Sequence, residues 1–177
     1  VLSKVTTPMI EEIPITNLDP RQVKQVDGAD KALISNPSYS REIYSAILKL
    51  APGCLEIRKK LRNLQFRLAS KNTKGFSTLF GRVAATPLMF RGKGDKNPEE
   101  ALAKAEELID KSVANIIAHQ ILVEAAIALE MKQTAVFGLE TIRQINPKDI
   151  KNLKELGNAY LEVGDTEKTI AIGNEIQ

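Results

Sequence analysis

Lysine and arginine residues are concentrated in one stretch of the sequence, where they could bind an anionic partner. From Arg58 to Lys96 there are 11 Lys and Arg residues against one acid, Asp95, whereas the remainder has 14 bases and 21 acids. The net charge of +3 therefore hides a strongly dipolar chain. Cations at this density can neutralise the phosphates of nucleic acid or of anionic lipids. The candidate basic patch comprises Arg58, Lys59, Lys60, Arg62, Arg67, Lys71, Lys74 and Arg82.

Charge alone does not identify a ligand for this stretch, so four interpretations stay open. We favour the plainest one, in which the interleaved apolar residues pack onto neighbouring helices and the bases form a solvated face or pair with the acidic remainder of the chain. An acidic protein partner comes next, followed by anionic membrane and nucleic acid. The apolar residues that could supply stacking or insertion contacts are Phe66, Phe76, Leu79, Phe80 and Phe90.

Residues that could support catalysis or metal binding are few. Cys54 is the only cysteine and His119 the only histidine, and neither has the partners that a nucleophile or a metal site requires. We expect Cys54 to be a small buried or half-buried thiol and His119 to be a packing or surface residue. The segment Arg91–Lys96 resembles a phosphate loop only superficially, because it lacks the Walker spacing. We expect no catalytic site, no cofactor and no metal, and hence no enzyme.

The stretch from Asn146 to Gln177 contains the clearest helical pattern in the chain, and other helices are predicted from it. Apolar residues recur at three- and four-residue steps, and Gly164-Asp165 interrupts them, which predicts helix, turn, helix. Leu156-Gly157 followed by Tyr160 is typical of the first helix of the tetratricopeptide repeat, which has a period of roughly 34 residues. The stretch therefore resembles one repeat of that family.

Stepping back by one period tests the resemblance. Leu156 falls on Leu122 and Val163 on Leu129, while Pro147 closes the earlier unit as the family pattern expects. A second step back gives a weaker match over 82–115. The sequence also departs from the family, since Thr169 and Gly173 replace its usual Ala and aromatic residue.

The resemblance implies an all-α, right-handed α-solenoid of about three to four hairpins. We expect an extended arm over 1–19, because Pro8 and Pro14 interrupt it and Pro20 follows it. A divergent hairpin over 20–54 and a basic inserted helix and loop over 55–81 follow. The three repeats are then predicted at 82–115, 116–149 and 150–177.

In this family the first helices of the hairpins line a concave groove that holds a peptide. Carried over by position, the predicted partner groove presents Ile117, Gln120, Ile121, Glu124, Lys151, Lys154, Asn158 and Leu161, with Ile127 beside them. Lys154 and Asn158 also resemble two positions of the carboxylate clamp in chaperone-adaptor members. We favour solvated helix residues there, because the rest of that clamp comes from later repeats.

These patterns predict a noncatalytic adaptor or assembly module that binds another protein or a peptide. The alternative is a module that docks to anionic membrane or nucleic acid through the basic insertion over 58–96. A single cysteine and the absence of a recognisable leader suggest a cytoplasmic location. Because Ile172 and Ile176 of the final helix have no following helix to cover them, we also expect either further chain or a possible end-to-end homodimer.

Overall fold

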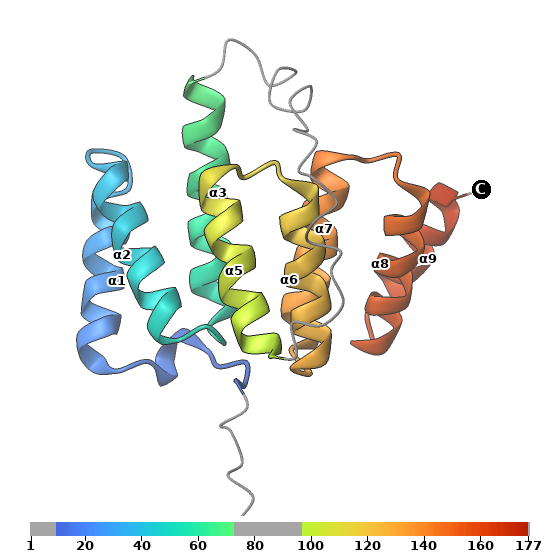
Figure 1. The fold of residues 1–177 in the computed structure, drawn as a ribbon, viewed down its shortest axis with the longest axis horizontal. Coiled ribbons are helices and arrows are strands. Elements are labelled where there is room, and N and C mark those ends of the chain that lie inside the picture. Colours follow the sequence, from blue (N-terminus) through green and yellow to red (C-terminus); the bar gives the residue numbers. More distant parts are fainter. Residues whose placement is uncertain (1–9, 73–96, 177) are drawn as a thin grey trace, which may run out of the picture.

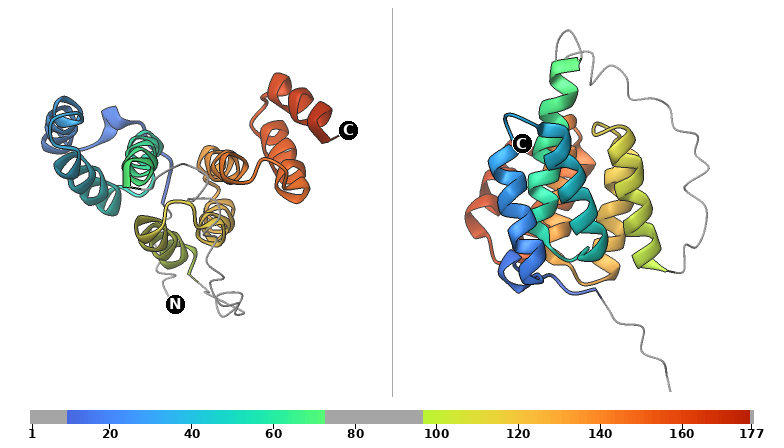
Figure 2. Two further views of the ribbon diagram at one scale, coloured as in Figure 1. Left: turned by 90° about the horizontal axis from the view of Figure 1, so that it is seen from above. Right: turned by 90° about the vertical axis from the view of Figure 1, so that its left-hand side faces the viewer.

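The computed structural model describes residues 10–72 and 97–176, and these ranges are all-helical. They contain eight α-helices, one short 3-10 helix (Ile15–Asn17) and no strand. The helices follow one another from α1 to α9 in a staggered row (Figure 1 and Figure 2). They are α1 (Pro20–Ala32), α2 (Pro37–Leu50), α3 (Leu55–Asn72), α5 (Pro98–Lys111), α6 (Ile116–Ala128), α7 (Lys132–Ile145), α8 (Ile150–Glu162) and α9 (Thr166–Ile176). The predicted all-α class is confirmed for these residues, whereas 73–96, with Lys74, Arg82 and the segment Arg91–Lys96, lies outside them.

Side-chain caps define where most of the helices begin. Asp19, Asn36, Asn97, Asn115 and Asp149 each accept a hydrogen bond from a backbone N–H in the first turn of the helix that follows. Such caps satisfy backbone donors that have no partner within the helix. In the first three cases a proline occupies the next position, which suits the fixed backbone angle of that residue.

The 34-residue phase read from the sequence is present in the helix boundaries. Helices α6 and α8 begin at Ile116 and Ile150, 34 residues apart, and α7 and α9 begin at Lys132 and Thr166 with the same separation. Helix α5, which begins at Pro98, lies one further period upstream of α7. The C-terminal part of the described chain is therefore a helical repeat.

The turns within the two C-terminal hairpins also repeat. Glu130 has φ 59° and Gly164, one period later, has φ 78°. After each of these residues the backbone N–H reaches back across the turn, from Met131 to the Ala126 carbonyl at 2.8 Å and from Asp165 to the Tyr160 carbonyl at 2.9 Å. The same helix end is thus built twice, with glycine in only one copy.

Helix α3 lies at the centre of the row, with a different neighbour on each side (Figure 2). Its residues Ile57, Leu61 and Leu64 belong to a core shared with α1 and α2. Phe66 belongs instead to a second core, which continues through α5, α6 and α7. A third core joins α6 and α7 to α8 and α9. The predicted inserted helix is therefore not an appendage, because it connects two cores.

The described part of the N-terminal arm, residues 10–19, packs along the helices. The Ile13 N–H donates to the Gly53 carbonyl at 3.1 Å. The Glu12 carboxylate accepts from the backbone N–H groups of Gln133 and Thr134 at the start of α7, at 3.2 and 2.5 Å. A carboxylate at a helix N-terminus is favourable for the helix dipole. The arm therefore ties α7 to the turn before α3.

The expectation for the final helix needs correction at Ile172. Its side chain is only 2% exposed, because α9 folds back on α8 and places Ile172 in the third core beside Gly157. Ile170, at 60% exposure, is the aliphatic residue of α9 that faces solvent. In the described ranges, no helix combines the length and apolar character that crossing a bilayer requires.

Gly53→Ala should destabilise the protein by about 2 kcal/mol, because a core without room for an added methyl group must distort. A Cβ at this position would lie 1.7 Å from the Glu11 carbonyl oxygen, so the arm would have to move. Urea unfolding measures the change. Gly28→Ala is the matched control, since its Cβ would meet only the Tyr39 hydroxyl at 3.8 Å and alanine favours a helix. Equal stability of the two variants would contradict the packing of the arm.

Glu130→Gly should stabilise the protein by about 1 kcal/mol, because glycine adopts positive φ without the steric cost of a side chain. The reciprocal variant Gly164→Ala should lose a similar amount at the equivalent turn. Thermal unfolding of both variants checks the pair. A loss of stability in Glu130→Gly would mean that the two turns do not share one geometry.

Candidate functional site

The outward face of α6 and α8 exposes large aliphatic side chains at equivalent positions of the repeat. Ile127 is 63% exposed and Leu161, 34 residues later, is 64% exposed. Helices α6 and α8 share the third core, in which Val123 of α6 belongs to the same cluster as Leu153 and Leu156 of α8. The two exposed aliphatic residues therefore lie on helices that both pack against α7 and contribute their buried faces to a common core.

Polar residues of the predicted groove surround these aliphatic side chains. Gln120 and Glu124 of α6 are exposed, as are Lys151, Lys154 and Asn158 of α8. Ile117 is half-buried, and so is Ile121, which packs against the second core. The structure therefore places six of the eight predicted residues on the surface, Leu161 among them, and the two isoleucines at its base. Lys154 and Asn158 lie one turn apart on the exposed side of α8.

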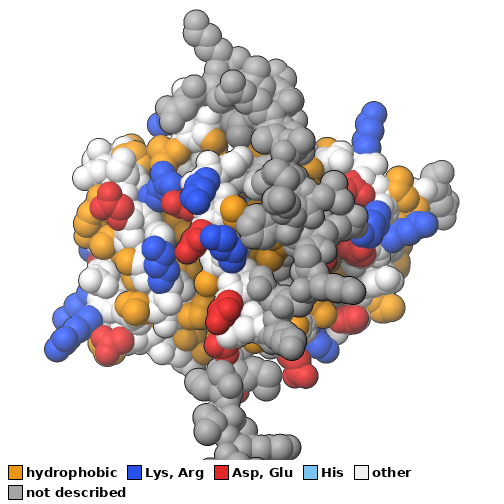
Figure 3. Space-filling model, viewed as in Figure 1, with side chains coloured by type: hydrophobic (Ala, Val, Ile, Leu, Met, Phe, Trp, Pro, Cys, Tyr) orange, Lys and Arg blue, Asp and Glu red, His pale blue; other side chains and the backbone are white. Residues whose placement is uncertain are grey.

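The predicted basic patch needs correction, because two of its members are inside the protein. Arg58 is 0% exposed and Arg62 is 1% exposed. Arg67 is half-buried and donates to the Leu33 carbonyl, while Lys60 pairs with Asp30 at 2.8 Å. Among the patch members within the described residues, Lys59 and Lys71 are exposed. Acidic and basic side chains interleave on the visible surface around α2, α3 and α5 (Figure 3). Pairing with the acidic remainder is the interpretation that the structure supports for Arg58, Lys60 and Arg62.

The two buried arginines share one carboxylate from α5. Arg58 Nε lies 2.8 Å from Glu106 Oε1, and Arg62 Nη2 lies 2.9 Å from Glu106 Oε2. Each carboxylate oxygen therefore accepts a charge-assisted hydrogen bond from a different guanidinium. Arg58 also donates from Nη2 to the Pro52 carbonyl at 2.7 Å. These contacts hold α3 against α5.

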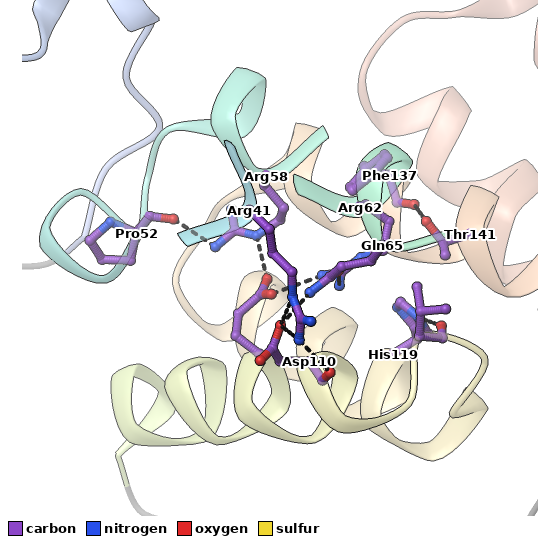
Figure 4. A network of polar contacts seen from close by, with 11 residues as sticks. Arg41, Pro52, Arg58, Arg62, Gln65, Asp110, His119, Phe137 and Thr141 are labelled. Carbon is purple, nitrogen blue, oxygen red and sulfur yellow. Dashed lines mark hydrogen bonds and ion pairs between the residues drawn. The ribbon is translucent and has the colours of Figure 1, made fainter. Parts of the chain in front are cut away.

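The network continues to a second carboxylate one helical turn along α5 (Figure 4). Gln65 accepts from Arg62 at 2.6 Å and donates to Asp110 at 2.9 Å. Arg41 reaches the same carboxylate from α2, with its Nη2 at 2.8 Å from Asp110 Oδ1. Three helices, α2, α3 and α5, thus meet through polar side chains.

The ionisation of this network follows from its contacts. Burial raises the pKa of the Glu106 carboxyl, but the charges and hydrogen bonds of Arg62 and Arg58 outweigh that effect and lower the pKa to about 2. Burial also lowers the pKa of His119 to about 3, aided by the nearby Arg62 charge. The His119 ring is therefore neutral at pH 7. Its Nε2 lies 2.8 Å from the Val113 carbonyl, and because a carbonyl only accepts, Nε2 must carry the proton.

Cys54 and His119, the residue types most often used as nucleophile or base, both lie inside the protein. Cys54 is buried, and burial raises the pKa of its thiol, which disfavours the nucleophilic thiolate. The predictions of a buried Cys54 and a packing His119 are confirmed. Across 10–72 and 97–176, no group of three His, Cys, Asp or Glu side chains is arranged to hold a metal ion.

Glu106→Gln should destabilise the protein by roughly 3 kcal/mol at pH 7, because it leaves two buried guanidinium groups without their charge partner. The folded-state pKa lies below the ordinary value of 4.5, so the stabilisation by the carboxylate is complete above pH 4.5 and is lost as the pH falls toward about 2. The difference between wild type and variant should therefore shrink across that window.

Urea unfolding at a series of pH values measures this difference. Glu107→Gln is the control, because that exposed neighbour pairs only with the exposed Lys104, and its substitution should change little. A Glu106→Gln variant with wild-type stability at pH 7 would show that the two buried arginines do not depend on Glu106.

The chain was compared with protein-family models, curated proteins and solved structures. No protein-family model matches the chain, and neither the curated proteins nor the solved structures contain a match. The functional argument therefore depends on the side chains described above.

Proposed function

We propose that the chain is a noncatalytic, right-handed α-solenoid of tetratricopeptide-like hairpins that binds a partner protein or peptide along the outward face of α6 and α8. The observation that carries the proposal is the exposure of Ile127 and Leu161, at 63% and 64%, at the same position of two successive hairpins. Exposed apolar groups at one repeat position form a row, and rows of this kind bind extended or helical segments.

Burial of this row supplies the driving force for binding in this proposal. Fully burying one aliphatic side chain contributes about 1.5–3 kcal/mol, and the two residues are already about one-third covered. The hairpins are held in place by the third core, so little ordering is required when a partner binds. Glu124 on α6 and the lysines Lys151 and Lys154 on α8 border the row with opposite charges. We expect these charges to set the direction of the bound segment.

Docking to nucleic acid or anionic membrane is less favoured by the described residues. Arg58 and Arg62 pair with Glu106, and Lys60 pairs with Asp30, so these charges already have partners within the chain. Of the six basic-patch members that the structure describes, only Lys59 and Lys71 are exposed, so these six contribute a weaker field than their number suggests. The protein-binding face remains our proposal.

Ile127→Ser combined with Leu161→Ser should weaken partner binding at least about ten-fold, because two apolar contacts are lost. The measurement is a pull-down from the native lysate read by mass spectrometry, followed by titration of the recovered partner. Ile34→Ser combined with Ile170→Ser is the matched control, since these aliphatic residues are also exposed, at 90% and 60%, but lie elsewhere.

Retention of the partner by the α6 and α8 double variant would contradict the proposal, as long as its helical content and unfolding temperature match the wild type. Two further measurements test the alternative, which is docking to nucleic acid or anionic membrane. They are partner binding over a series of salt concentrations and partner binding by the double variant Lys59→Glu with Lys71→Glu. Steep loss of binding with salt, together with loss in the lysine variant, would assign the function to the basic surface instead.

A further inference from the structure

A cleft of about 770 Å³ lies between α2, α3 and α5, away from the α6 and α8 face. Its walls are largely apolar and include Leu48, Pro52, Leu61 and Leu102, with Ile10 of the arm also contributing. Arg58, Gln65 and Glu106 from the polar network line the same cleft. Its volume falls within the range of small-molecule sites, which are mostly apolar with a few placed polar groups.

The polar network beside the cleft has one more cation than anion, and of its three arginines Arg58 is the one that lines the cleft. Arg41, Arg58 and Arg62 form the polar network with only two carboxylates, Glu106 and Asp110. At the rim the lining lysines Lys49 and Lys111 are matched by Glu99 and Glu107. The excess of one positive charge is therefore located in the network itself. An uncompensated charge in a low-dielectric position is costly, so one more anion would be stabilising there.

Unpaired guanidinium donors lie in the same network. Arg58 uses Nε for Glu106 and Nη2 for the Pro52 carbonyl, but its Nη1 is buried and has no hydrogen-bond partner in the described part of the chain. Arg62 Nε is also buried and has no hydrogen-bond partner among the described residues. A buried donor without an acceptor costs about 1–3 kcal/mol. Of these two arginines only Arg58 lines the cleft, so an oxygen anion in the cleft would both accept from Arg58 Nη1 and offset the excess charge.

We propose that this cleft binds a small monocarboxylic acid with an apolar body, its carboxylate directed to the Arg58 guanidinium and its body against Leu48, Leu61 and Leu102. A singly charged head matches the single excess charge. A phosphate dianion would bring a second negative charge close to Glu106, whose pKa is lowered by Arg62 and Arg58, and a neutral ligand would leave the charge uncompensated. The cleft is separate from the protein-binding face proposed above and is argued from different residues.

Octanoate and octanamide are the probes that test the carboxylate, and the full chain is titrated with each by isothermal calorimetry. Octanoate should bind at least about ten-fold more tightly than octanamide, because only the acid supplies the charge. Absence of octanoate binding up to about 5 mM would overturn the proposal, and so would equal affinities of the acid and the amide.

The cleft itself is tested with Ala103→Phe, which fills space at an exposed wall position of α5 and leaves the polar network intact. This variant should lose octanoate binding at least about ten-fold. Ala46→Phe, at an exposed position of α2, is the matched control and should bind as wild type does. Unchanged binding by Ala103→Phe would place the ligand elsewhere and overturn the assignment.

Two further titrations complete the test. Sodium acetate has the carboxylate without the apolar body, so it should compete only weakly with octanoate. Equal competition by acetate or chloride would mean an adventitious ion only. A peptide with a free C-terminal leucine that binds while octanoate does not would show that the cleft takes a protein terminus, which also overturns the small-acid proposal.

Discussion

The pairing of two buried arginines from α3 with one carboxylate from α5 is the interaction on which the rest of the structure depends. Apolar side chains join the neighbouring helices, and α3 and α5 share such a core through Phe66, but these two helices also meet through the buried charges of Arg58, Arg62 and Glu106. Long charged side chains hold two helices further apart than Leu or Ala would. The same interaction that joins the two halves of the row therefore also leaves the cleft between them.

The C-terminal hairpins show how a repeated sequence phase becomes a repeated surface. A period of 34 residues places α6 and α8, and then α7 and α9, in equivalent positions. The equivalence extends to single residues, since Glu130 and Gly164 both have positive φ and Ile127 and Leu161 are equally exposed. The equivalence is closest between α6 and α8, whereas Val136 of α7 is buried and Ile170, at the same position of α9, is exposed.

Sequence reasoning succeeded where the information is local or periodic. Asn36-Pro37 and Gly164 mark a helix start and a hairpin turn, and the repeat phase places α6 to α9 correctly, because caps and periodicity act over a few residues. It failed for Arg58 and Arg62 because a count of charges ignores which face each charge occupies. The sequence did contain a sign of this buried network, since Arg58 and Arg62 are four residues apart and so lie on one face of their helix. Glu106 and Asp110 of α5 have the same spacing. The cleft had no such signal, since its walls come from segments that meet only in the fold.

Helix α3 gives the two proposed sites a physical connection. Its Arg58 lines the cleft, while its Phe66 lies in the second core, against which Ile121 at the base of the α6 and α8 face also packs. Close-packed cores transmit small displacements because they contain few voids. A ligand that draws Arg58 toward the cleft would act on α3 as a rigid body and so on Phe66. Arg58 and Arg62 thus join the N-terminal helices to the C-terminal ones. The second core then lies between the cleft that Arg58 lines and the exposed face of α6 and α8.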